Sequence, residues 1–92
     1  MSYTAKPGRR SVVCVDVRPS KGTVIRWDLT ELEAVDLIDD LLRKAAMARL
    51  DDSAVLIEIN LGAAMFTDRI MPDVAVEIAN GIADVLEAAD AS

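Results

Sequence analysis

Residues 11 to 42 read SVVCVDVRPSKGTVIRWDLTELEAVDLIDDLL, and this stretch decides the fold. It begins with a valine-rich run at 12–17, passes through turn-forming residues, and continues as a second β-branched and aromatic run at 23–29. Two such runs around a Pro-Ser-Lys-Gly turn predict a β-hairpin. Pairing Val17 with Thr23 makes one face of the hairpin wholly apolar. The residues on that face are Val13, Val15, Ile25 and Trp27.

A helix is expected directly after the second run, at 30–49. Thr30 and Glu33 have the spacing of a capping box, in which each side chain bonds the backbone N–H of the other residue. Apolar residues then recur every three or four positions, which indicates one buried helical face. That face comprises Val35, Ile38, Leu42, Ala45 and Arg49, widened by Ala34, Leu41 and Ala48.

The rest of the chain predicts one further strand and one further helix. Apolar and polar residues alternate at 54–60, which is typical of a half-buried strand. Pro72 suits a first helical turn, so a second helix is expected at 72–88. The intervening residues 63–70 fit either a short edge strand or a loop. The buried stripe of the second helix is expected at Met71, Ala75, Ile78, Ile82, Val85 and Ala89.

These elements predict an α+β fold in two layers, ββαβ(β)α, with a small antiparallel or mixed sheet and two helices packed on one face. Sliding the second helix back by 44 residues aligns Ile82 with Ile38 and Ala89 with Ala45. This match fits either a ββα duplication or a coincidence between common helix residues.

The chain is expected to form a single domain with a flexible N-terminal arm. Its 92 residues are too few for two cores, and 52% of them are apolar, well above the level of disordered chains. Residues 1–10 show no periodicity and predict the arm, so 11–92 form the α+β domain. A core of this size is small, which favours self-association.

No arrangement of residues typical of catalysis is visible. The chain has no histidine and a single cysteine, Cys14, which removes the commonest general base and metal ligand and any intramolecular disulfide. No nucleophile-base pair, metal-ligand spacing or phosphate-binding loop occurs. We therefore expect a protein that is not an enzyme, with no catalytic residue, no cofactor and no metal site.

Charge is distributed unevenly along the chain. Residues 1–27 carry six cations against Asp16 alone, a net charge of +5, whereas the remainder carries −11. A basic patch on the arm and first hairpin would suit a nucleic-acid-binding regulator, which is the alternative function. The net charge of −6 argues against it, so we expect no nucleic-acid binding. The patch would comprise Arg9, Arg10, Arg18, Lys21 and Arg26.

Protein–protein interaction is the function that the sequence favours. The run Ala63-Ala64-Met65-Phe66 lies beside a glycine in the segment with the weakest periodicity, where apolar side chains are either packed internally or cover a partner. We expect Met65 and Phe66 to form an interface for a homodimer and for an unidentified protein partner. No run of about 20 apolar residues occurs and 1–10 lack a signal-peptide centre, so a cytoplasmic location without membrane contact is expected.

The segment Leu29 to Ala46, LTELEAVDLIDDLLRKAA, resembles a pattern in small uncharacterised proteins of actinobacteria and their phages. In that pattern a strand leads into leucine-threonine, acidic-alanine steps, paired leucines and an alanine-rich end. The tail from Pro72 to Ala91 is similar. The resemblance implies a source and a style of fold, and it implies no activity, cofactor or partner.

Overall fold

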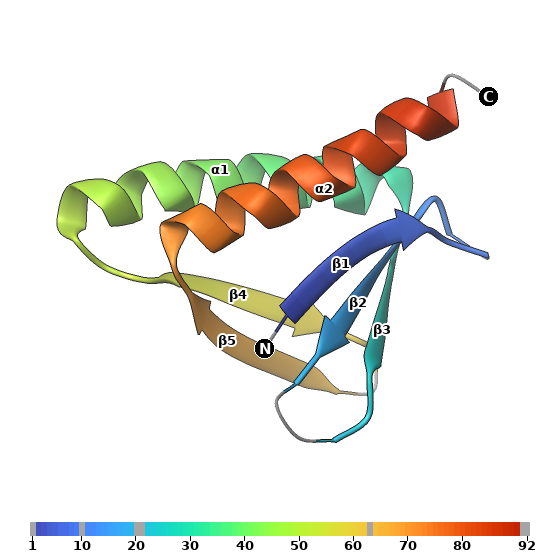
Figure 1. Ribbon diagram of the computed structural model, residues 1–92, viewed down its shortest axis with the longest axis horizontal. Coiled ribbons are helices and arrows are strands. Elements are labelled where there is room, and N and C mark those ends of the chain that lie inside the picture. The colour runs from blue at the N-terminus through green and yellow to red at the C-terminus, as the bar shows by residue number, and fades with distance from the viewer. Residues whose placement is uncertain (1, 10, 20–21, 63, 91–92) are drawn as a thin grey trace.

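The computed structural model describes residues 2–9, 11–19, 22–62 and 64–90. Within these ranges the chain forms five strands and two helices (Figure 1). In chain order these are β1 (Ser2–Pro7), β2 (Val13–Arg18), β3 (Ile25–Leu29), α1 (Glu31–Asp51), β4 (Val55–Asn60), β5 (Met65–Ile70) and α2 (Pro72–Asp90).

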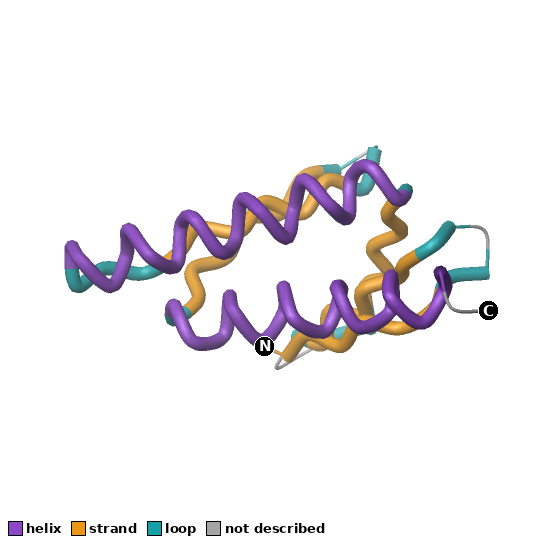
Figure 2. Tube along the Cα trace, turned by 90° about the horizontal axis from the view of Figure 1, so that it is seen from above, coloured by secondary structure: helices purple, strands orange, loops and turns teal. Residues whose placement is uncertain are grey.

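The strands form two separate antiparallel sheets, one of three strands in the order β1-β2-β3 and one made by the β4-β5 hairpin. The helices lie side by side, α1 over the two-stranded sheet and α2 over the three-stranded sheet (Figure 2). The predicted α+β class with helices layered on sheets is confirmed. The strands are divided between two sheets, where the sequence predicted one.

The N-terminal segment corrects the prediction of an arm over residues 1–10, because Ser2–Pro7 form β1. Tyr3 and Ala5 lie opposite Val17 and Val15 of β2, on the apolar face of the sheet. The helix α2 packs on β1, with Gly81 of the helix facing the Ala5 side chain. β1 therefore depends on contacts with residues far along the chain, which the local pattern of residues 1–10 does not contain.

The first hairpin forms as predicted but in a different register. Val17 pairs with Ile25 and Val15 with Trp27, a shift of two residues from the predicted pairing of Val17 with Thr23. A shift of two keeps every side chain on its predicted face, because side chains alternate along a strand. The connection is longer than predicted, and Gly22 in it adopts a left-handed backbone with φ of 108°.

The helix α1 begins with the predicted capping box. Thr30 Oγ1 accepts a hydrogen bond from the backbone N–H of Glu33, and the Glu33 carboxylate accepts one from the N–H of Thr30. The predicted buried face is rotated, since Val35 and Leu42 are exposed. α1 packs against α2, and most of its buried residues are small alanines. The buried residues of α1 are Ala34, Leu41, Ala45 and Ala48.

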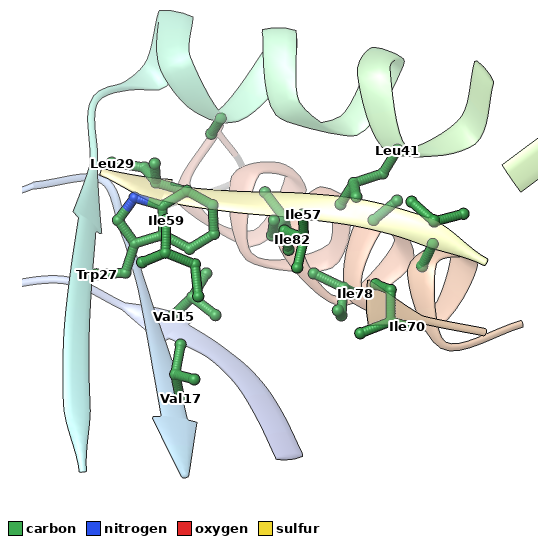
Figure 3. Close-up of a cluster of buried hydrophobic side chains, with 14 of the residues drawn as sticks. Val15, Val17, Trp27, Leu29, Leu41, Ile57, Ile59, Ile70, Ile78 and Ile82 are labelled. Carbon is green, nitrogen blue, oxygen red and sulfur yellow. The ribbon is translucent and has the colours of Figure 1, made fainter. Parts of the chain in front are cut away.

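The structure also answers two open questions, whether residues 65–70 form a strand and which face of α2 is buried. Residues 65–70 are a strand, β5, paired with β4 in register from Val55 opposite Ile70 to Asn60 opposite Met65. In α2 the expected stripe is buried at its centre, whereas Met71 and Ala89 are exposed. The buried residues of α2 are Ala75, Ile78, Ala79 and Ile82. Side chains from both sheets and both helices meet in one hydrophobic core, which includes Trp27 as predicted (Figure 3).

The segments β2-β3-α1 and β4-β5-α2 repeat the same β-β-α order. The helices begin at Glu31 and Pro72, 41 residues apart. At the same spacing, fully buried Ala34 matches Ala75 and Leu41 matches Ile82. Strands β2 and β4 match at a spacing of 42, and their buried pairs are Val13 with Val55, Val15 with Ile57 and Val17 with Ile59. The structure thus supports a duplication, at a spacing different from the 44 residues that the helices alone indicate.

Candidate interaction surfaces

The outer face of the three-stranded sheet, which faces away from the core, is polar. The strand registers place Lys6, Cys14 and Asp28 in one row across it, and Asp16 and Arg26 in the next. The turn after β1 closes one side of this face and leaves a pocket of about 530 Å³. We call it the outer pocket; its lining residues are Lys6, Pro7, Gly8, Arg9, Cys14, Arg26 and Asp28.

Asp16 is the central charged group of this face. Its side chain is only 10% exposed, and Lys6 Nζ lies 2.8 Å from its Oδ2 atom. The hydrogen bond from Lys6 holds the pKa of the Asp16 carboxyl below its usual value, against the opposing effect of burial. Asp16 is therefore ionised, and the positive charge of Lys6 balances its negative charge.

Cys14 lies beside this ion pair and is buried. Burial raises the pKa of its thiol, and the negative charges of Asp28 and Asp16 raise it further. Its Sγ lies 3.8 Å from Asp16 Oδ1, to which the thiol donates a weak hydrogen bond. Because the thiolate is the reactive form of cysteine, this arrangement favours an unreactive thiol. The outer pocket is thus suited to binding rather than to nucleophilic chemistry.

The predicted basic patch is only partly assembled. Arg9 and Arg26 both line the outer pocket, together with Lys6, which the sequence did not single out. Arg18 is exposed at the end of β2 and is not among the residues that line this pocket. Arg10 and Lys21 lie outside the described residues. Lys6 was missed because the segment that carries it was predicted to be an arm.

Met65 and Phe66 lie on β5 and are exposed to 61% and 45%. They are consecutive in a strand, so their side chains point to opposite faces of the sheet. Phe66 is opposite buried Ile59 and therefore on the inner face, whereas Met65 shares the outer face with Asn60. The two side chains are accessible together only at the rim of the sheet, on the side of β5 where no other strand of the described residues pairs with it.

Among the described strands β4 and β5 pair only with each other, so the two-stranded sheet has two free edges. Leu61 N–H donates to the carbonyl of Ala64 at 2.9 Å, which makes these two residues a hydrogen-bonded pair. Such pairs alternate along an antiparallel ladder. Leu56, Glu58 and Asn60 therefore direct their N–H and C=O groups away from β5, and we call these groups the free edge of β4. The corresponding free edge of β5 consists of Met65, Thr67 and Arg69.

No family model, curated protein or solved structure matches this chain. The resemblance to small actinobacterial and phage proteins therefore stays a prediction.

Within the described ranges no three histidine, cysteine, aspartate or glutamate side chains are grouped closely enough to hold a metal ion. No helix in the same ranges is both long enough and apolar enough to cross a membrane.

One contact between the sheets was not foreseen from the sequence. The Tyr3 hydroxyl of β1 donates a hydrogen bond to Asp68 Oδ2 of β5 at 2.5 Å. Burial and this carboxylate together raise the pKa of Tyr3 above its usual range. The contact joins strands 65 residues apart, and only a prediction of β1 would have identified it.

Proposed function

We propose that this chain is a small protein–protein interaction or regulatory protein, without catalytic activity, that acts in the cytoplasm as a homodimer. The observation that carries the proposal is the rim of β5, where Met65 and Phe66 are exposed beside backbone groups to which no strand in the described ranges is paired. Exposed apolar side chains on an open strand edge are the kind of surface that a second chain covers.

A two-fold contact between the β5 edges of two copies suits the residues on this edge. Antiparallel pairing centred on Thr67 would place Thr67 opposite its own copy and Met65 opposite Arg69. Threonine pairs are favourable across strands, and no like charges lie opposite each other in this register. Pairing would also bring the Phe66 side chains of both copies to the same contact.

Sedimentation equilibrium of wild type and Phe66→Asp tests this interface. The variant should shift the dimer to monomer and lower the melting temperature, because it places a charge where the dimer would bury an aromatic ring. Leu50→Asp is the matched control, since Leu50 is also exposed but lies near the end of α1. A wild-type monomer at high micromolar concentration refutes the dimer. A dimer that resists Phe66→Asp refutes only the position of the contact.

The outer pocket favours one second candidate, a nucleic-acid-binding regulator. Arg9, Arg26 and Lys6 meet at this pocket, and cations of this kind contact phosphates. We expect no such binding, because Asp16 and Asp28 share the same face. Micromolar, salt-sensitive binding of DNA or RNA that is lost on charge reversal of Arg18, Lys21 and Arg26 would favour this candidate over the interaction protein.

A further inference from the structure

The duplication leaves one strand position without a counterpart. In the first half, β2 pairs with β3 on one side and with β1 on the other. In the second half, β4 matches β2 and β5 matches β3, but among the described strands β4 pairs with β5 alone. The free edge of β4 is therefore the position that corresponds to the one filled by β1.

This position lies under α1, as β1 lies under α2 (Figures 1 and 2). A hollow of about 340 Å³ is lined by α1 and the beginning of β4, and exposes Met47 and Leu56. A second hollow of about 490 Å³ reaches Asn60 at the end of β4. Asp40 and Arg43 line both hollows, one beside each end of β4, and we call the two hollows together the β4 groove.

The backbone groups in the β4 groove are available for strand pairing. Leu56, Glu58 and Asn60 direct N–H and C=O groups into it, as shown by the alternation of the ladder. The Lys44 ammonium donates to the Leu56 carbonyl at 3.4 Å, which agrees with this direction. A long contact of this kind from an exposed lysine protects an open edge and is readily replaced by a strand N–H.

Charge indicates what binds in the β4 groove. Its two cations, Arg43 and Lys44, already pair with Asp39 and Asp40. The other acidic side chains that line it are Glu33, Asp36 and Asp51, and Glu58 is exposed on β4 itself. At the spacing of the duplication, Glu58 takes the place of Asp16, which in the first half forms its salt bridge with Lys6 of β1. An acidic edge of this form selects a basic strand and disfavours a second copy of the same edge.

We propose that the free edge of β4 binds an extended, basic peptide segment of a partner protein by antiparallel strand addition, with a lysine or arginine of the segment paired to Glu58. Main-chain hydrogen bonds supply affinity in this mode, and alternate side chains supply specificity. The inference rests on the proposed role as an interaction protein, and it does not depend on the homodimer, which uses the other edge of the same sheet.

The chain supplies its own probe, a synthetic peptide with the sequence of residues 2–10, SYTAKPGRR. Its first part is the strand that fills the equivalent position, and it ends in two arginines. The β2 edge is occupied by β1 in the folded chain, so the peptide is expected at β4. Titration into the full chain, followed by amide NMR, should perturb and protect the N–H groups of Leu56, Glu58 and Asn60. Fluorescence anisotropy of the labelled peptide gives the affinity.

Two variants and one matched control make the test decisive. Leu56→Pro removes an N–H from the free edge of β4 without removing one from the β4-β5 ladder, and should weaken binding about tenfold or more. Thr67→Pro makes the same change on the free edge of β5 and should leave binding unchanged. Glu58→Lys should also weaken binding about tenfold, and replacing the peptide lysine with glutamate should have the same effect. Trp27 fluorescence reports that each variant is folded.

Four results of the binding experiments would overturn the proposal, and one result of sedimentation would do so as well. The four binding results are no saturable binding at millimolar peptide, perturbation of β2 or β5 amides in place of β4 amides, loss of binding in Thr67→Pro with retention in Leu56→Pro, and binding unaffected by Glu58→Lys. If Leu56→Pro instead dissociates a wild-type dimer in sedimentation equilibrium, the occupant is a second copy and the peptide proposal is also overturned. A wild-type monomer that binds the peptide refutes the homodimer and leaves this inference standing.

Discussion

At the residue scale, polar side chains join parts of the fold that are distant in sequence. Lys6 and Asp16 join β1 to β2 on the outer face of one sheet, and Tyr3 and Asp68 join the two sheets. In each case a group from β1 meets a carboxylate that is partly or largely shielded from water. These bonds fix the N-terminal strand in position, because a buried carboxylate left without its partner would be costly.

The bond between Tyr3 and Asp68 makes the stability of the fold decrease at alkaline pH. The pKa of Tyr3 is raised in the folded chain, by burial first and by Asp68 second, whereas the unfolded tyrosine ionises near pH ~10. The stabilisation is therefore complete below pH ~10 and is lost as the pH rises above it. Tyr3→Phe should lower the free energy of unfolding at neutral pH by about 1 kcal/mol and should flatten the alkaline dependence.

Urea unfolding at several pH values, followed by the fluorescence of Trp27, measures both effects. Tyr3 is the only tyrosine in the chain, so the absorbance of tyrosinate reports its ionisation without interference. An unchanged alkaline loss of stability in Tyr3→Phe would show that another group causes it.

At the element scale, strands and helices with strong local signals could be predicted, and those that depend on distant contacts could not. The capping box of Thr30 and Glu33 predicts the start of α1 from four consecutive residues, and the helix begins there in the structure. β1 has only two inward apolar side chains, and it forms because β2 offers an edge and α2 a cover. The register of the first hairpin is set by the length of its connection, which the composition of the turn does not determine.

Gly81 is the weak point of α2, and the structure shows that a larger residue fits there. A Cβ atom added at Gly81 would lie 3.6 Å from the Cβ of Ala5, an ordinary van der Waals distance. Glycine inside a helix is about 1 kcal/mol less favourable than alanine. Gly81→Ala should therefore raise the free energy of unfolding by about 0.5 to 1 kcal/mol.

The control is Gly81→Leu, whose longer side chain would push α2 away from β1 and lower stability. Urea unfolding compares the two variants with wild type. Destabilisation by Gly81→Ala would mean that β1 and α2 are closer than a methyl group permits.

At the scale of the whole molecule, the duplication organises both the core and the candidate surfaces. The sequence suggested it at a spacing of 44 residues, and the structure supports 41. The difference of three residues is close to one helical turn, so both alignments place apolar residues on similar faces. Only the starts of the helices and the matching strands distinguish them, and these depend on a second hairpin that the sequence left open.

The candidate surfaces, like the duplication, were predicted only in part from the sequence. Met65 and Phe66 are exposed, but on opposite faces of β5, because the sequence did not establish that they lie in a strand. Arg9 and Arg26 meet at the outer pocket, whereas Arg18 does not line it. The free edge of β4 has no local signature at all, since it exists only as the position that β1 fills in the other half.

The packing of the halves predicts that neither folds alone. Each helix covers the sheet of the other half: α2 packs on β1 and β2, and α1 packs on β4. Separating the chain at the turn of Asp52 and Ser53 would expose the inner face of each sheet to water. The fragments 1–52 and 53–92 should each lack stable structure, and mixing them should restore it with equal stoichiometry, because only the pair buries the core.

Circular dichroism and Trp27 fluorescence of each fragment, and of their equimolar mixture, measure this directly. Ile82 is fully buried in α2, so the fragment 53–92 carrying Ile82→Asp should fail to restore structure to fragment 1–52, which controls for non-specific association. Fragment 1–52 contains the three-stranded sheet and α1. If it folded alone with Trp27 buried, α1 would have to cover its own sheet, and the exchange of helices between the halves would not be needed for stability.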